Sequence, residues 1–166
     1  RAWCAAFDGD PDVTLVLKAG RQGDARQNFE FMQSELQRAL AGIKPRRAFP
    51  RIDVSPHLLS AAQMRQLHEL CHAYVSLAHA EGWGLPAWEA TLAARPVVHT
   101  AWSAPMEFVH PQGLVACNLT PVYGMTEFVP YYDNSMHWAE PHLDDAVEKL
   151  RALRRDYAAW SATAAA

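Results

Sequence analysis

Short runs of β-branched residues alternate with stretches of helical periodicity along this chain, and that alternation constrains its fold most. The clearest apolar runs are 13–17, 73–77 and 96–100, and a weaker one covers 113–117. Strands that alternate with helices favour a parallel sheet covered by helices. The sequence therefore predicts an α/β fold, with a Rossmann-like parallel sheet flanked by helices.

The first expected helix follows a loop around Gly20 and Gly23. Its apolar residues recur at helical spacing, which predicts a helix with an apolar stripe. A second strand is expected at about 47–54, although Pro50 is unusual in the middle of a strand. The stripe consists of Phe29, Met32, Leu36, Leu40 and Ile43.

The later helices have recognisable ends. Ser60 and Gln63 are spaced as in a capping box, which satisfies backbone donors at a helix start. Pro86 suits the first position of the next helix, and Pro96 stops that helix before the following strand. We assign no element to residues 118–138.

A C-terminal helix is expected to open at Pro141, with Asp144 and Asp145 near the positive end of its dipole. Arginines in the later turns suit the negative end of the same dipole. Its apolar stripe consists of Leu143, Val147, Leu150, Leu153 and Tyr157.

Bulk properties exclude several classes of function. The chain has 166 residues, a net charge of −3 and a pI near 6.2, which gives no electrostatic reason to expect nucleic acid as a partner. No apolar run is long enough for a transmembrane segment, and no signal-peptide pattern is present. Cys4, Cys71 and Cys117 lie among apolar neighbours and are odd in number, so we expect reduced thiols in a cytoplasmic protein.

The segment His79-Ala-Glu-Gly-Trp-Gly-Leu-Pro-Ala-Trp-Glu-Ala90 holds the strongest functional signal. It follows an expected strand, passes through a glycine-containing turn and enters a helix. Ligands of open parallel sheets bind beyond the carboxyl ends of the strands, and a helix start offers unpaired N–H groups to a phosphate. We expect Glu81 in the turn and Glu89 one turn into the helix to face the same crevice.

Two carboxylates beside a phosphate site can accept hydrogen bonds from vicinal hydroxyls. Glu89 would suit a ribose and Glu81 a hexose, while backbone amides bind the diphosphate between them. A purely structural interpretation also stays open, in which Gly82 and Gly84 shape a tight turn and Glu89 is a solvated helix residue.

The string Glu81-Gly-Trp-Gly-Leu-Pro-Ala-Trp-Glu89 resembles the E-x7-E signature of retaining GT-B glycosyltransferases, the group 1 or family 4 set. The resemblance covers residues 5–155 in outline and is strongest over 73–107. Arg95 stands where a glycine is common in the family, and Ala104 replaces the glycine that usually follows Ser103. Further similar stretches are Leu15–Gly20, Ala90–Val98, Trp102–Glu107 and Trp138–Pro141.

This resemblance implies transfer of a sugar from a nucleotide diphosphate sugar to an acceptor with retention at the anomeric carbon, by a hexosyltransferase-like enzyme without a metal or other cofactor. Glu81 would be the catalytic residue that holds the donor sugar, and Glu89 would bind the ribose. His79 would contact the diphosphate or the acceptor, and Val54, at the end of a strand, would touch the base. The amides that stabilise the departing diphosphate would come from Gly82, Trp83, Gly84 and Leu85.

The same resemblance makes residues 1–166 a single C-terminal donor-binding domain. Its first strand and the N-terminal acceptor domain would precede Arg1, so the fragment alone is expected to be inactive. The expected partners are a UDP- or GDP-linked sugar and that acceptor domain. We expect a cytoplasmic location, and peripheral membrane attachment of the full-length protein stays open.

Other classes of function remain as alternatives. His68-Glu-Leu-Cys-His72 matches the H-E-x-x-H pattern, which places two zinc-binding imidazoles on one helix face. We expect that helix to end at once without a third ligand, so two partly exposed histidines are the plainer interpretation.

A non-catalytic nucleotide-binding module is also open, because fold alone does not settle function. Gly82-Trp-Gly84 lacks the third glycine of the dinucleotide fingerprint, which argues against NAD or FAD. Five aromatic residues could stack on sugars or cover a domain interface: Trp102, Tyr123, Tyr131, Tyr132 and Trp138.

Overall fold

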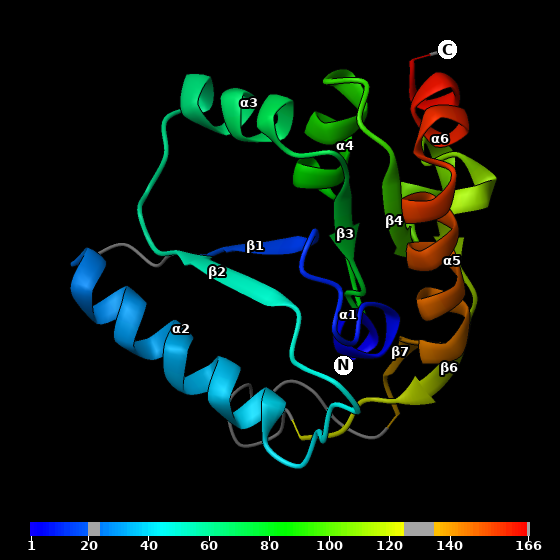
Figure 1. The fold of residues 1–166 in the computed structure, drawn as a ribbon. Helices are drawn as coiled ribbons and strands as arrows, with labels where there is room; N and C mark the ends of the chain where they lie inside the picture. Colours follow the sequence, from blue (N-terminus) through cyan, green and yellow to red (C-terminus); the bar gives the residue numbers. More distant parts are fainter. Residues whose placement is uncertain (20–23, 125–134, 166) are drawn as a thin grey trace. The chain divides into compact units, whose positions relative to one another are not determined.

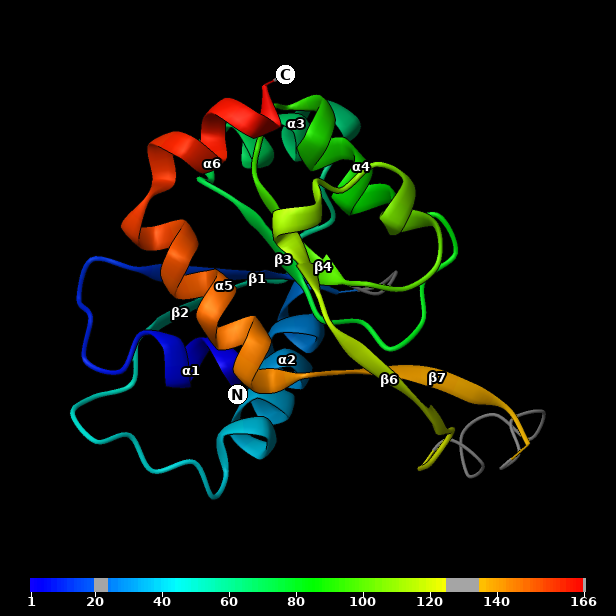
Figure 2. The same ribbon diagram turned by 90° about the vertical axis from the view of Figure 1, so that its right-hand side faces the viewer.

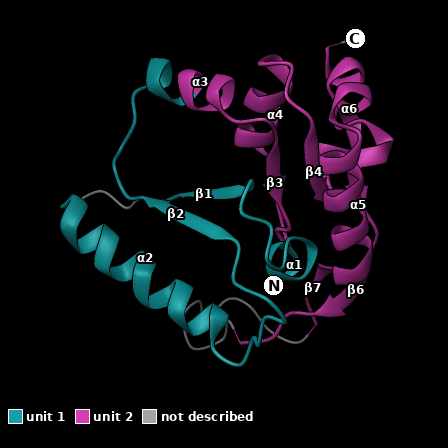
Figure 3. Cartoon of the chain, viewed as in Figure 1, with its two compact units in different colours: residues 1–64 teal, residues 65–166 magenta. Residues whose placement is uncertain are grey.

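The computed structural model describes residues 1–19, 24–124 and 135–165 (Figure 1). By its internal contacts the chain divides into two compact units, Arg1–Met64 and Arg65–Ala166 (Figure 3). Gly20 and Gly23, named above for a loop, and the aromatic residues Tyr131 and Tyr132 lie outside the described residues.

Unit 1 contains a parallel pair of strands joined by a helix. After the short helix α1 (Ala2–Ala6), strand β1 (Thr14–Lys18) leads to helix α2 (Ala25–Leu40) and strand β2 (Arg51–Ser55). The strands pair in parallel register, with Leu15 opposite Ile52. This confirms the expected strand–helix–strand order. β2 begins only after Pro50, which has no N–H to donate to a ladder.

The apolar stripe of α2 is only partly buried. Phe29 is 40% exposed, and the following stripe residues Met32, Leu36 and Leu40 are half-buried. Ile43 lies beyond the helix, which ends at Leu40. The helical spacing is therefore confirmed up to Leu40, and the two-stranded sheet of this unit offers little apolar area to cover the helix.

Helix α3 (Ala61–Leu70) begins at the expected capping box. The backbone N–H of Ser60 donates to Gln63 Oε1 at 2.9 Å, and the N–H of Gln63 donates to Ser60 Oγ at 3.3 Å. The reciprocal pair satisfies two donors that a helix start leaves unpaired.

A three-stranded parallel sheet lies at the centre of unit 2, with the order β3 (Tyr74–Ser76), β4 (Val97–Thr100) and β5 (Leu114–Val115). All four residues of β4 are buried. Helix α4 (Leu85–Leu92) contacts β3 and β4, and α5 (Leu143–Arg155) contacts β4 and β5. The structure thus shows an α/β fold of short parallel sheets flanked by helices.

An antiparallel hairpin occupies part of the stretch to which the sequence assigned no element. It is formed by β6 (Cys117–Pro121) and β7 (His137–Pro141) and leads into α5 (Figure 2). Pro141 therefore ends a strand instead of opening the helix, whose N-cap is His142.

The C-terminal helical segment is broken at Asp156, and α6 (Tyr157–Ala164) follows it. Asp144 and Asp145 lie in the first turn of α5, as expected, and Leu150 and Leu153 are buried. Leu143, by contrast, is 43% exposed, because it is the first residue of the helix.

A small apolar cluster fixes α4 on the sheet. Ala87 and Ala90 of α4 pack with Val97 and Val109, and Phe108 covers them. Alanines at these helix positions allow close approach of the helix to the strands, which sets the position of the turn before α4.

Cys4, Cys71 and Cys117 are free cysteines. Among the described residues, no helix combines the length and the apolar character needed to cross a bilayer.

Candidate functional site

The candidate site is the turn between β3 and α4. Gly84 is the N-cap of α4 and has a left-handed backbone, with φ 82° and ψ 49°. A Cβ at this position would lie 3.1 Å from Pro105 Cγ and 3.2 Å from Glu81 Cγ. The left-handed conformation therefore favours glycine here, and a Cβ would fit only if Pro105 and Glu81 moved by a few tenths of an ångström. The first helical hydrogen bond runs from Trp88 N–H to the Gly84 carbonyl at 2.9 Å.

The start of α4 is suited to an anion. α4 begins at Leu85, so Pro86 occupies the second helical position instead of the first. Gly84 has no side chain to cap the helix, and Pro86 has no N–H. The remaining first-turn amides, those of Leu85 and Ala87, have no intrahelical acceptor, and the helix dipole adds partial positive charge at this end.

The carboxylate of Glu81 lies in this turn. Glu81 Oε1 accepts a hydrogen bond from its neighbour, the N–H of Gly82, at 3.1 Å. Burial raises the pKa of the Tyr74 phenol, the negative charge of Glu81 raises it further, and the hydroxyl of Ser76 acts in the opposite direction. Tyr74 is the half-buried first residue of β3, so the charge of Glu81 reaches only weakly along the strand.

Glu89 faces a different neighbour. Its side chain is 48% exposed, and Oε2 lies 3.6 Å from Nε2 of His68, whose side chain is only 8% exposed. Within the described residues, no hydrogen bond or ion pair joins Glu89 to Glu81. The shared crevice proposed for the two carboxylates thus stays a prediction, with Glu81 in the turn and Glu89 directed to α3.

His79 belongs to a cluster that links the turn to the β6–β7 hairpin. Its Nε2 lies 2.9 Å from Glu140 Oε2, and its ring stacks on Trp138 with centroids 4.3 Å apart. The Tyr123 hydroxyl donates to the same Glu140 oxygen at 3.0 Å, and its ring contacts Trp138 edge-on at 4.8 Å. The backbone joins the two segments as well, since Ala139 N–H donates to the His79 carbonyl at 2.9 Å.

Sequence reasoning missed Glu140 and Tyr123 as neighbours of His79. The signal available was the stretch Trp138-Ala-Glu-Pro141, which gives no indication of a partner as distant in sequence as His79. Only the pairing of the hairpin with the turn brings these residues together.

The aromatic side chain of Trp83 packs against two other rings and is partly exposed to solvent. It contacts Trp88 at 5.8 Å and Phe108 at 5.7 Å between ring centroids, and it remains 44% exposed. Leu85 is 62% exposed. The roles predicted for these two residues use their backbone amides and do not depend on these side-chain positions.

Val54, predicted to touch the base, belongs to unit 1. It lies in β2 opposite Leu17 of β1. The other predicted site residues all belong to unit 2, from His79 to Glu89.

The two histidines of the H-E-x-x-H pattern do not share a helix face. α3 ends at Leu70, as expected, so His72 lies beyond the helix and packs edge-on against Tyr157 at 5.3 Å. His68 is buried and lies near Tyr74 and Glu89. Within the described residues no group of three or more candidate ligands could hold a metal ion. The expectation of two imidazoles on one face is therefore wrong, and so is that of a partly exposed His68.

Ala94 and Ser103 have positive φ angles. Each directly precedes a residue at which the sequence departs from the family pattern, Arg95 and Ala104 respectively. Ala94, not Arg95, has the left-handed backbone at the end of α4, with φ 52°. The N–H groups of Ala94 and Arg95 donate to the carbonyls of Thr91 and Ala90, which is the Schellman arrangement. Ser103, not Ala104, has φ 61°, and its hydroxyl lies 3.5 Å from the Gly82 carbonyl.

No protein-family model and no curated protein matches this chain. Functional inference therefore rests on the turn itself, which combines free helix-start amides, carboxylates that accept hydrogen bonds, and an aromatic cluster around His79.

Proposed function

We propose that this chain is the donor-binding domain of a retaining GT-B glycosyltransferase and binds a nucleotide diphosphate sugar at the turn between β3 and α4. The observation that carries the proposal is the placement of the E-x7-E string. Its first glutamate lies in a turn after a parallel strand, its second glycine is the left-handed N-cap of α4, and its last glutamate lies on that helix.

The diphosphate is the part of the donor that suits the helix start. A Cβ-free N-cap lets an anion approach the first-turn amides, and the dipole of α4 favours negative charge there. As the bond from the anomeric carbon to the diphosphate breaks, negative charge develops on the leaving group, the acceptor oxygen bonds to that carbon, and the acceptor's hydroxyl proton passes to the departing diphosphate. Fixed amide dipoles stabilise such charge without reorganisation.

The hydroxyl groups of the donor suit the carboxylates. Glu81 is held in the turn by Gly82 and would accept hydrogen bonds from the sugar. Glu89 has an exposed side chain and would accept hydrogen bonds from the ribose. His79 is oriented by Glu140 and Trp138, so it would present one defined ring edge to the diphosphate or the acceptor.

Calorimetric titration of the chain with UDP, GDP, ADP and NAD tests the proposal. We expect one nucleoside diphosphate to bind and NAD not to bind. Glu89→Ala should weaken that binding roughly ten- to a hundredfold, because a hydrogen bond to a charged group contributes about 1.5–3 kcal/mol. Glu148→Ala, an exposed position on α5, is the matched control and should leave binding unchanged.

A second variant separates the two carboxylates. Glu81→Gln should weaken binding of the nucleotide sugar while leaving binding of the nucleoside diphosphate nearly unchanged, since only the former has a hexose. Absence of binding by all three nucleoside diphosphates, or equal losses in Glu89→Ala and Glu148→Ala, would contradict the proposal.

A further inference from the structure

A pocket of about 180 Å³ lies in unit 2 at the opposite end of the sheet from the glycine turn. It borders Pro96 and Val97, at the start of β4, whereas the turn follows the carboxyl end of β3. None of the residues predicted for nucleotide-sugar binding lines it. Its walls come from the end of α4, from the 3-10 turn η2 (Pro111–Gly113) and from α6.

The charge in this pocket is that of Arg95. Its side chain lines the pocket, and its Nε atom is buried without a hydrogen-bond partner. Within the part of the chain that the structure describes, Arg95 forms no salt bridge, and no aspartate or glutamate lines the pocket. Arg95 as a whole is half-buried, and a carboxylate matches the planar fork of a guanidinium.

One part of the pocket wall is apolar, and polar groups line the rest. Phe108 and Trp160 contribute aromatic rings, with Trp160 only 7% exposed, and Pro96 and Val97 add aliphatic surface. A cavity of about 150 Å³ is enough to bind benzene. The pocket therefore has room for one ring-sized apolar group beside the guanidinium.

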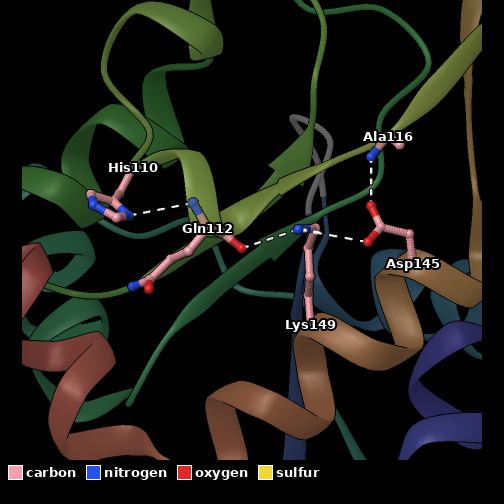
Figure 4. A network of polar contacts seen from close by, with 5 residues as sticks. All are labelled: His110, Gln112, Ala116, Asp145 and Lys149. Atoms are coloured by element: carbon pink, nitrogen blue, oxygen red, sulfur yellow. Dashed lines mark hydrogen bonds and ion pairs between the residues drawn. The ribbon is translucent and has the colours of Figure 1, made fainter.

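Its polar wall is held in place by the network in Figure 4. The N–H of Gln112 donates to His110 Nδ1 at 3.4 Å, and Lys149 Nζ donates to the Gln112 carbonyl at 3.2 Å. Lys149 also pairs with Asp145 at 3.6 Å, and Asp145 Oδ2 accepts the N–H of Ala116 at 2.7 Å.

The same wall is tied to α6. The Gln112 side-chain amide donates to Thr163 Oγ1 at 2.7 Å, and the Thr163 hydroxyl donates to the Trp160 carbonyl at 2.9 Å. The wall is thus ordered before any ligand arrives, which lowers the entropic cost of binding.

We infer that this pocket binds a small monocarboxylate with a ring-sized apolar body. The carboxylate lies against the Arg95 guanidinium, and the apolar body lies between Phe108 and Trp160. The inference is independent of the proposed nucleotide-sugar site.

Titration of the full chain with benzoate, benzamide and inorganic phosphate tests this inference, with binding followed by calorimetry and amide chemical shifts. Benzoate should bind and shift the amides of Gly113 and Thr163. Benzamide, which has the same shape without the charge, should bind at least tenfold more weakly, and so should phosphate, which lacks the apolar body.

Arg95→Gln should weaken benzoate binding at least tenfold, whereas Arg65→Gln, an exposed position on α3, should not change it. Circular dichroism of both variants checks that the fold is retained, and Arg95→Lys, which keeps the charge, should recover part of the affinity. The inference is overturned if the folded wild-type chain shows no saturable benzoate binding, if benzamide or phosphate binds as tightly, or if the shifts map to residues 79–85.

Discussion

The two units contain the same local arrangement, parallel strands joined through a helix, yet they bury it to different degrees. β4 of unit 2 is buried along its whole length, whereas in β1 of unit 1 Val16 is 37% exposed. On the helices, Leu150 of α5 is 2% exposed and Phe29 of α2 is 40% exposed. Helical and strand periodicity therefore determine which element forms, while the number of neighbouring strands determines how much apolar area leaves water.

The largest expected effect is a truncation that compares the two units directly. Leu150→Ala should destabilise unit 2 by about 3–5 kcal/mol, because it leaves a cavity in a buried site. Phe29→Ala should cost roughly 1 kcal/mol in unit 1, since part of the ring already contacts water. Hydrogen exchange of the β4 and α2 amides measures the two losses separately. Equal losses would contradict the difference in burial.

Backbone crowding gives a second comparison. A Cβ on Gly113 would lie 1.9 Å from the carbonyl oxygen of Val97, whereas a Cβ on Gly9 would meet the side chain of Arg47 at 2.7 Å. Gly113→Ala should cost about 3 kcal/mol or more, because backbone in the sheet must move. Gly9→Ala should cost about 1–2 kcal/mol, mainly from its left-handed φ of 76°. Thermal unfolding of both variants measures the loss of stability in each. A larger loss for Gly9→Ala would contradict the tighter backbone contact at Gly113.

Strain gives a third comparison, because the described non-glycine residues with positive φ, Ala94 and Ser103, both belong to unit 2. A well-packed region can hold such residues against their own preference. Ala94→Gly should therefore stabilise the protein by about 0.5–1 kcal/mol, as the left-handed cost disappears. Ala93→Gly, with φ −84°, should lose a similar amount. Chemical denaturation measures both, and a loss in Ala94→Gly would show that the helix end is misassigned.

The smallest expected effect concerns an exposed polar contact of unit 1. The Asp8 carboxylate accepts the backbone N–H groups of Arg46, Arg47 and Ala48 at 3.0, 3.1 and 3.3 Å. The Arg47 N–H is the main reason that the pKa of Asp8 lies below its ordinary 3.8. The contact therefore stabilises the fold above pH 3.8. This stabilisation is lost as the pH falls through the lower pKa that Asp8 has in the folded state.

Asp8→Asn should lower the stability of unit 1 slightly at neutral pH. The difference from the wild-type chain should shrink as the pH falls below 3.8. Thermal unfolding of both proteins across this range measures it, and a difference that does not vary with pH would contradict the role of the carboxylate.

Local signals were enough to predict most elements. The capping box at Ser60 and Gln63 is encoded in four consecutive residues, so its geometry is as expected. The β6–β7 hairpin was not predicted, because Cys117-Asn-Leu-Thr-Pro121 is mostly exposed and lacks clear alternation. The break at Asp156 was also missed, because the apolar stripe continues across it to Tyr157.

In the candidate site, too, features set by neighbouring residues were predicted, and contacts between distant segments were not. The turn from His79 to Gly84 follows from its strand, glycine and helix signals, which are contiguous. The contact between His79 and Glu140 depends on pairing between distant segments, which no local pattern encodes. The pocket at Arg95 likewise requires α4, η2 and α6 to meet.

The most direct test of the central claim is an amide chemical-shift map of the chain titrated with the nucleoside diphosphate that binds most tightly. We expect the largest shifts on residues 79–85, at the turn and the start of α4, with a smaller group around Glu89. Shifts concentrated at Arg95, Gly113 and Thr163, or no shifts at all in the folded chain, would contradict it.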